Sequence, residues 1–144
     1  MISLEQWNAR VAVANACLAQ FEGREHEYGK ADCLRLAASC LKRMGHQVPL
    51  AKIGFYKTEI GALRTLKRLG FANMIEAMDA QGFPRIAPSK AWPADIVAIA
   101  APEPWVGSLA VKLAGAGLLG SMEGYPFAAI DPTVHIPVAA WRVD

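Results

Sequence analysis

Apolar residues near the start of the chain recur at alternating spacings of three and four, the period of a helix with one buried face. This pattern predicts a helix from Leu4 to Glu22. Ser3 and Gln6 form a capping-box signature at its start, and Gly23 is suited to end it. The apolar positions of this stripe are Leu4, Trp7, Val11, Ala14, Leu18 and Phe21.

A second helical stripe begins at Cys33 and closes at Gly45, after a polar connection over residues 24–31. Asp32 is suited to be its N-cap, because a short acidic side chain accepts bonds from the free N–H groups of a first helical turn. Cys33 is therefore expected in the first turn, at the edge of the core. The apolar positions of this stripe are Cys33, Leu36, Ala37, Cys40, Leu41 and Met44.

The rest of the chain changes from helical to extended patterns. Residues 46–56 are predicted to form a loop, and shorter helices are predicted over Thr58–Leu69 and Phe71–Ala80, on either side of Gly70. From Gly82 onward, prolines recur too often for long helices. Short strands are predicted at Asp95–Ala100, Leu109–Ala114, Leu118–Met122, Tyr125–Ile130 and Val138–Val143, with hairpin turns at 115–117 and 123–124.

Helices followed by an antiparallel sheet, with one face of the sheet in need of a helical cover, predict an α+β architecture. At 144 residues, the chain is expected to form a single domain over 1–144. Hydrophobic residues make up 53% of it and charged residues 19%, a composition that favours a subunit docked onto partners. A net charge of +2 argues against nucleic acid and an anionic membrane surface as partners.

The cysteines Cys17, Cys33 and Cys40 are odd in number and show no paired spacing, so neither a disulfide framework nor a metal site is expected. No cofactor is predicted. The first residues lack the basic and apolar regions of a signal peptide, and no apolar run is long enough to span a membrane. We therefore expect a protein made in the cytoplasm, without a membrane span.

The segment from Tyr28 to Cys33 holds the clearest candidate chemistry. A thiol in the first turn of a helix lies near the positive end of the helix dipole, which is expected to lower the pKa of Cys33. Asp32 would fix the helix start, and a close backbone approach at Tyr28-Gly29 would let N–H donors reach an oxyanion. The alternative is that Cys33 is a small buried apolar residue, since free cysteines are commonly buried.

The order of these motifs resembles the NlpC-type, papain-like cell-wall cysteine peptidases. The resemblance implies a papain-like fold, with Tyr28, Gly29, Asp32 and Cys33 in the nucleophile segment and Asp95 at the start of the first core strand. It is closest to small phage- and prophage-encoded proteins of unassigned function found among tail genes. Segments similar to that branch are 54–58, 61–63, 93–97 and 140–143.

In active members of the superfamily, the general base is a histidine at the start of the following strand. The matching stretch here, residues 106–111, contains no histidine. The histidines of the chain are His26 and His46, both expected in loops, and His135, which we retain as a weak base candidate. Asp95 itself is expected to hydrogen-bond a neighbouring loop rather than to act in catalysis.

Two functions follow from the resemblance. The first is a structural or adaptor protein of a phage tail tip or baseplate, incorporated in the virion and catalytically degenerate, with other tail proteins as partners. The second is a peptidoglycan endopeptidase or amidase that uses Cys33 as nucleophile during phage entry. A small-molecule thiol enzyme is a third alternative. Trp92 and Trp105, which lie close to prolines, are candidate docking anchors.

Overall fold

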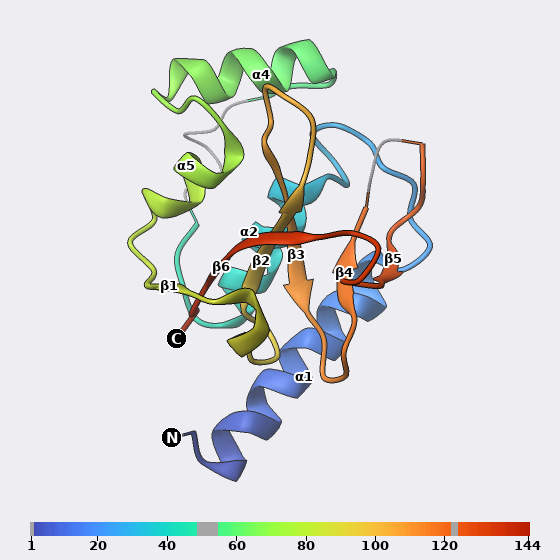
Figure 1. The fold of residues 1–144 in the computed structure, drawn as a ribbon. Coiled ribbons are helices and arrows are strands. Elements are labelled where there is room, and N and C mark those ends of the chain that lie inside the picture. Colours follow the sequence, from blue (N-terminus) through green and yellow to red (C-terminus); the bar gives the residue numbers. More distant parts are fainter. Residues whose placement is uncertain (1, 49–54, 122–123) are drawn as a thin grey trace.

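The computed structural model describes residues 2–48, 55–121 and 124–144, and within these ranges the chain begins with helices and ends with strands (Figure 1). Each α-helix starts after a side chain that accepts a hydrogen bond from its first turn, and these N-caps are Ser3, Asp32, Thr58 and Asn73. The helices are α1 (Leu4–Phe21), α2 (Cys33–Arg43), α4 (Glu59–Arg68) and α5 (Met74–Asp79).

The strands form one antiparallel sheet in the order β1-β6-β2-β3-β4-β5, with a 3-10 turn, η1 (Pro88–Lys90), before β2. The central hairpin pairs Ile96 of β2 with Val111 of β3 and Ile99 with Ser108. The strands are β1 (Arg85–Ile86), β2 (Ile96–Ala100), β3 (Gly107–Lys112), β4 (Leu118–Gly120), β5 (Ala128–Ile130) and β6 (Pro137–Trp141).

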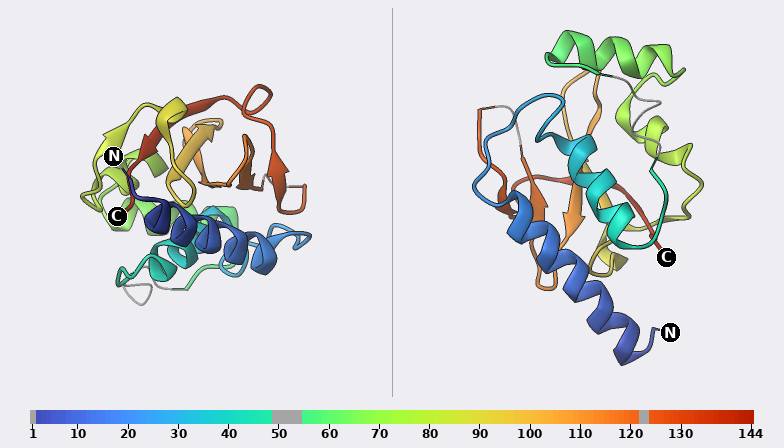
Figure 2. Two further views of the ribbon diagram at one scale, coloured as in Figure 1. Left: turned by 90° about the horizontal axis from the view of Figure 1, so that it is seen from below. Right: turned by 180° about the vertical axis from the view of Figure 1, so that it is seen from behind.

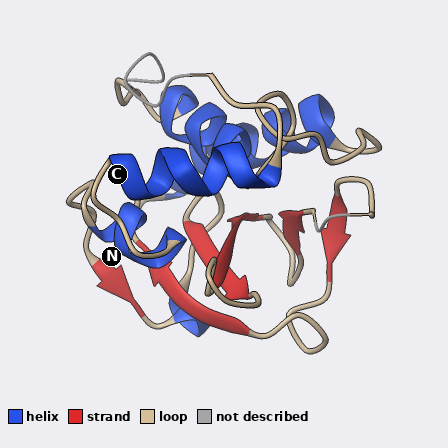
Figure 3. Cartoon of the chain, turned by 90° about the horizontal axis from the view of Figure 1, so that it is seen from above, coloured by secondary structure: helices blue, strands red, loops and turns tan. Residues whose placement is uncertain are grey.

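The helices α1 and α2 cover one face of the sheet, and the sheet is curved (Figures 2 and 3). The covered face shares its core with both helices, and that core includes Phe21, Leu36 and Trp141. The opposite face carries a second, smaller apolar cluster in which Val97 and Ile99 are almost fully buried. Helices α4 and α5 lie together at the end of the molecule where β2 turns into β3 (Figure 1).

The α+β class predicted from the sequence is confirmed, and the predicted helices and strands match observed elements to within a few residues at each end. The capping box is present, because Gln6 N–H donates to Ser3 Oγ and Ser3 N–H donates to Gln6 Oε1. Gly23 and Gly45 follow their helices with φ of +82° and +93°. Strand β1 was not predicted, and the predicted residues Met122 and Glu123 lie outside the described residues.

The predicted buried stripe of α1 is wrong in part. Leu4 is 76% exposed, and Trp7 and Val11 are only half-buried. The buried positions are Arg10, Ala14, Cys17 and Phe21, so the inward face is rotated and includes an arginine. An apolar count cannot find this face, because Arg10 is buried by an ion pair rather than by its hydrophobicity.

Candidate functional site

Cys33 begins α2 and is half-buried, as the sequence predicts for a thiol at the edge of the core. Its neighbour Asp32 is 3% exposed, and both of its carboxylate oxygens accept hydrogen bonds. Oδ1 accepts from the Arg35 N–H at 2.8 Å. Oδ2 accepts from the Gly29 N–H at 2.8 Å and from the Tyr56 hydroxyl at 2.6 Å. Asp32 therefore closes the loop before α2 and ties it to residue 56.

Gly29 is where the backbone passes closest to Tyr56. It has a φ of +83°, and a Cβ placed on it would lie 2.0 Å from the Tyr56 carbonyl oxygen. Only glycine fits such an approach without displacing the backbone. The sequence predicts a close approach here, but with the N–H free for an oxyanion. Instead, the Gly29 N–H donates to Asp32, so this donor is already used.

The pKa of Cys33 is raised from 9.0 to about 11, so the prediction of a lowered pKa is wrong. Burial is the main cause, and the negative charge of Asp32 adds to it. The backbone N–H of Leu109 and the hydroxyl of Ser108 hydrogen-bond the thiolate and act in the opposite direction, but they do not compensate. The thiol is therefore neutral at physiological pH.

Ser108 of β3 lies beside Cys33 of α2. It belongs to the stretch 106–111, which the resemblance matches to the strand of the catalytic histidine. A serine hydroxyl hydrogen-bonds a thiolate but does not accept its proton near neutral pH. Leu109 is buried on the same strand and contributes only its backbone to the thiol. The nearest partners that the structure gives to Cys33 thus orient the sulfur without activating it.

His26 approaches the site through aromatic contacts. It packs edge-on against Tyr28, with ring centroids 4.6 Å apart, and Tyr28 in turn stacks on Trp105 at 6.5 Å. Both His26 and Tyr28 line the cavity that contains Cys33. We call His26, Tyr28 and Trp105 the aromatic row. Glu59 accepts a hydrogen bond from Trp105 Nε1 at 3.2 Å, which connects α4 to this row.

The other two histidines lie elsewhere. His135 belongs to the turn before β6, where its backbone N–H donates to the Asp131 carbonyl. The pKa of Asp131 is lowered chiefly by the hydrogen bonds from Thr133, and His135 acts in the same direction. His135 is not among the residues that line the cavity beside Cys33. His46 packs edge-on against Phe83 at 4.9 Å. The structure thus brings His135 and Cys33 to different places.

A cavity of about 490 Å³ opens beside Cys33, between α2, α4, α5 and the β2–β3 loop. Its walls are largely apolar, and its polar lining residues include Asp32, Ser108 and Glu59. Its volume lies in the range of small-molecule and peptide-anchor pockets, about 300–1,000 Å³. The wall residues from the three helices include Leu34, Ala37, Ala38, Leu41, Ala62, Leu66, Met74 and Met78.

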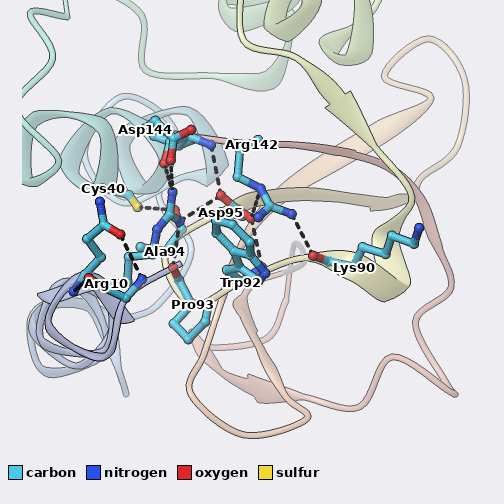
Figure 4. Close-up of polar contacts among 12 residues, drawn as sticks. Arg10, Cys40, Lys90, Trp92, Pro93, Ala94, Asp95, Arg142 and Asp144 are labelled. Carbon is cyan, nitrogen blue, oxygen red and sulfur yellow. Dashed lines mark hydrogen bonds and ion pairs between the residues drawn. The ribbon is translucent and has the colours of Figure 1, made fainter. Parts of the chain in front are cut away.

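Asp95 is the centre of a separate polar cluster (Figure 4). It is fully buried, and its Oδ1 accepts from Arg10 Nη1 and from the Val143 N–H, each at 2.9 Å. Its Oδ2 accepts from the Trp92 N–H at 2.8 Å. Arg142 Nε lies 3.1 Å from the same oxygen, close enough for an ion pair though not aligned for a hydrogen bond.

The two arginines extend this cluster to α1 and to the end of the chain. Arg10 also donates to the Pro93 carbonyl, to the Val143 carbonyl and to Asp144. Trp92 lies against both guanidinium groups, at 5.3 Å from Arg10 and 3.4 Å from Arg142. Trp92 is half-buried, and its ring packs against the guanidinium groups of the cluster.

Asp95 and Cys33 lie at opposite ends of the central hairpin. The backbone carbonyl of Asp95 accepts a hydrogen bond from the Lys112 N–H, whereas Cys33 lies beside Ser108, four positions earlier on β3. That separation is roughly 13 Å at about 3.3 Å per strand residue. Asp95 therefore supports the fold, as expected for a residue that bonds a neighbouring loop, and does not touch the thiol.

Two of the residues that organise these sites, Tyr56 and Arg10, escaped the sequence reasoning. Tyr56 lies in an irregular segment with no periodicity to mark it, and Arg10 sits among apolar residues of a helix. Ser108 did have a signal, because it belongs to the stretch 106–111 that the resemblance matches to the strand of the base. Its significance rests on alignment with the motif order, since nothing in its own neighbourhood distinguishes it from any strand serine.

Within the described ranges, no group of three or more histidine, cysteine, aspartate or glutamate residues is placed to hold a metal ion. None of the described helices is long and apolar enough to cross a membrane. Residues 3–143 match the model of one protein family, described as a domain of unknown function (DUF6950). No curated protein matches the chain.

Proposed function

The chain belongs to the DUF6950 family of unknown function, and from that premise we propose that it is a catalytically inactive, NlpC-like protein that docks partners in a phage tail. The observation that carries this proposal is the environment of Cys33. Its thiol has a pKa of about 11, and its neighbour on β3 is Ser108 in place of a histidine. A papain-like mechanism needs both a thiolate and a base within hydrogen-bond reach.

The remaining motif residues support the same interpretation. Asp32 accepts hydrogen bonds from the Gly29 N–H and the Tyr56 hydroxyl, and Asp95 accepts one from Arg10. These are structural uses that persist after catalysis is lost. The resemblance to tail-associated NlpC-like proteins supplies the setting, and the open apolar cavity supplies a surface on which a partner can bind.

The first experiment compares the wild-type chain with Cys33→Ala. We expect neither protein to release peptides from purified cell wall, and virions that carry Cys33→Ala to assemble and infect normally. Virions that lack the chain should fail to assemble functional tails. Wall hydrolysis that disappears in Cys33→Ala would instead establish the peptidase alternative, and absence of the chain from purified tails would refute the tail role.

The second experiment restores the missing base. We expect iodoacetamide to modify Cys33 at pH 7 about 100-fold more slowly than an ordinary thiol, as measured by peptide mass spectrometry, because the thiolate fraction falls about tenfold for each unit by which a pKa rises. Ser108→His should accelerate this modification, since an imidazole would then face the sulfur. Ser89→His, at an exposed serine of η1, is the matched control. Equal rates in both variants would show that Ser108 does not occupy the base position.

A further inference from the structure

The cavity beside Cys33 has a chemical character that the loss of catalysis does not explain. We propose that it is the docking site for a segment of a partner protein that carries large apolar side chains next to lysine or arginine. This inference rests on the proposed docking function and adds the chemistry of the partner.

Small side chains line part of the cavity. Ala37 and Ala38 of α2 and Ala62 of α4 line its walls, and each is buried in the fold. Larger side chains at these positions would occupy part of the cavity volume. An opening of about 490 Å³ accommodates one or two large apolar side chains of a partner.

The deeper wall is adaptable as well as apolar. Met74 and Met78 of α5 are 4% and 3% exposed and line the cavity beside Leu66 of α4. Methionine side chains are flexible and polarisable, so they adjust to apolar groups of different shape. The neutral thiol of Cys33 also presents no charge to an incoming apolar group.

The charged residues that line the cavity, as far as the described ranges go, all carry negative charge. Among the described residues that line it, these are Asp32, Glu59 and Glu103, and no lysine or arginine lines it, although the chain carries 15 of them. Both oxygens of Asp32 accept hydrogen bonds, and one oxygen of the half-buried Glu59 accepts from Trp105, whereas Glu103 is exposed. Carboxylates at an apolar opening attract a cationic partner and disfavour an acidic one.

The aromatic row strengthens this preference. Tyr28 and Trp105 lie half-buried at the cavity, and their ring planes are within 14° of parallel. The faces of aromatic rings attract lysine and arginine side chains. Acidic and aromatic groups thus meet at one side of an apolar cavity, which suits a basic residue beside an apolar anchor. A fatty acid would instead bring its carboxylate toward Glu59 and Glu103.

The test uses a random library of short peptides selected on the full-length protein. We expect the enriched peptides to combine large apolar residues with lysine or arginine, and binding of a representative peptide to be measurable by fluorescence anisotropy. Ala62→Phe should weaken that binding at least about tenfold by filling the cavity. Ala12→Phe, which adds the same ring at an exposed position of α1, should leave it unchanged.

The charge preference is tested separately. Glu59→Gln combined with Glu103→Gln should weaken binding of the basic peptide several-fold, whereas Glu76→Gln, at an exposed position of α5, should have no effect. Acidic enriched peptides, or binding that Ala62→Phe does not change, would overturn the proposal. So would binding of a fluorescent fatty acid with no peptide enriched. These readouts do not depend on wall hydrolysis or virion assembly, so they fail independently of the proposed function.

Discussion

The two ends of the central β2–β3 hairpin hold polar groups in opposite states. At one end, both oxygens of Asp95 are bonded, and two arginines share its charge inside the core. At the other end, the Cys33 thiol has a hydroxyl and a backbone N–H as partners and faces a cavity. The same sheet therefore supports a fully paired cluster at one end and an open binding site at the other.

The difference separates residues that support the fold from a thiol that lines a cavity. Asp32 and Asp95 are the two acidic residues that the NlpC resemblance singles out, and each connects distant parts of the chain. Loss of either carboxylate would leave buried N–H or O–H donors without an acceptor, so stability alone accounts for the presence of both residues. Among the described residues, the hydrogen-bond partners of the Cys33 thiol include the Leu109 backbone N–H and the Ser108 hydroxyl, which both belong to β3.

The largest expected effect is at the paired end. Asp95→Ala would remove the buried counter-charge of Arg10 and leave only the exposed Asp144 paired with it, and we expect a loss of about 3–5 kcal/mol in the free energy of unfolding. Urea denaturation would measure it, with Asp95→Asn as a milder variant if the alanine variant does not fold. Glu27→Ala removes an exposed ion pair with Lys30 and should cost less than about 1 kcal/mol. Similar losses for the two alanine variants would contradict the structural role given to Asp95.

A smaller effect is expected at the loop that precedes Cys33. Gly29→Ala places a Cβ against the Tyr56 carbonyl in addition to requiring a positive φ, so we expect a loss of about 2–3 kcal/mol. Gly45→Ala has the same kind of backbone conformation and no atom within 4 Å of the new Cβ, so only about 1 kcal/mol is expected. Thermal unfolding of the two variants would separate the steric contact from the backbone preference. Equal costs would remove the evidence for a tight approach at Gly29.

The smallest effect is the response of the Cys33 end to alkaline pH. Because folding raises the pKa of this thiol from 9.0 to about 11, its contribution to stability is complete below pH 9 and decreases as the pH rises from 9 to 11. The pKa of Tyr56 is also raised, chiefly by burial, so the wild-type curve contains both contributions. The difference between wild type and Cys33→Ser, followed by urea denaturation across this range, isolates the thiol. A difference that does not change with pH would mean that folding leaves the pKa of Cys33 unchanged.

Local signals predicted most of the secondary structure. The capping residues Ser3 and Asp32 and the glycines after α1 and α2 act within a few positions of the helix ends, so their effect is visible in the sequence. Prolines likewise mark where helices stop. Strand β1 escaped because a pair of residues at a sheet edge carries no periodic pattern, and its pairing with β6 joins segments far apart in the chain.

The sequence predicted the burial of side chains less well than it predicted the secondary structure. The sequence predicts a sheet with one face covered by helices, yet Ala110 on the other face is also almost fully buried. The sheet curves, and the second apolar cluster fills its concave side. Arg10 was hidden for a related reason, since its burial depends on Asp95, a partner 85 positions away.

By itself, the sequence determined the α+β class, the start of α2 at Asp32 and the position of Cys33 in its first turn, because these depend on periodicity and on neighbouring residues. The tertiary structure alone decided the state of that thiol. Burial and the charge of Asp32 raise its pKa, and β3 brings Ser108 to its side. These effects arise from groups that folding gathers around one atom, and no local pattern encodes their sum.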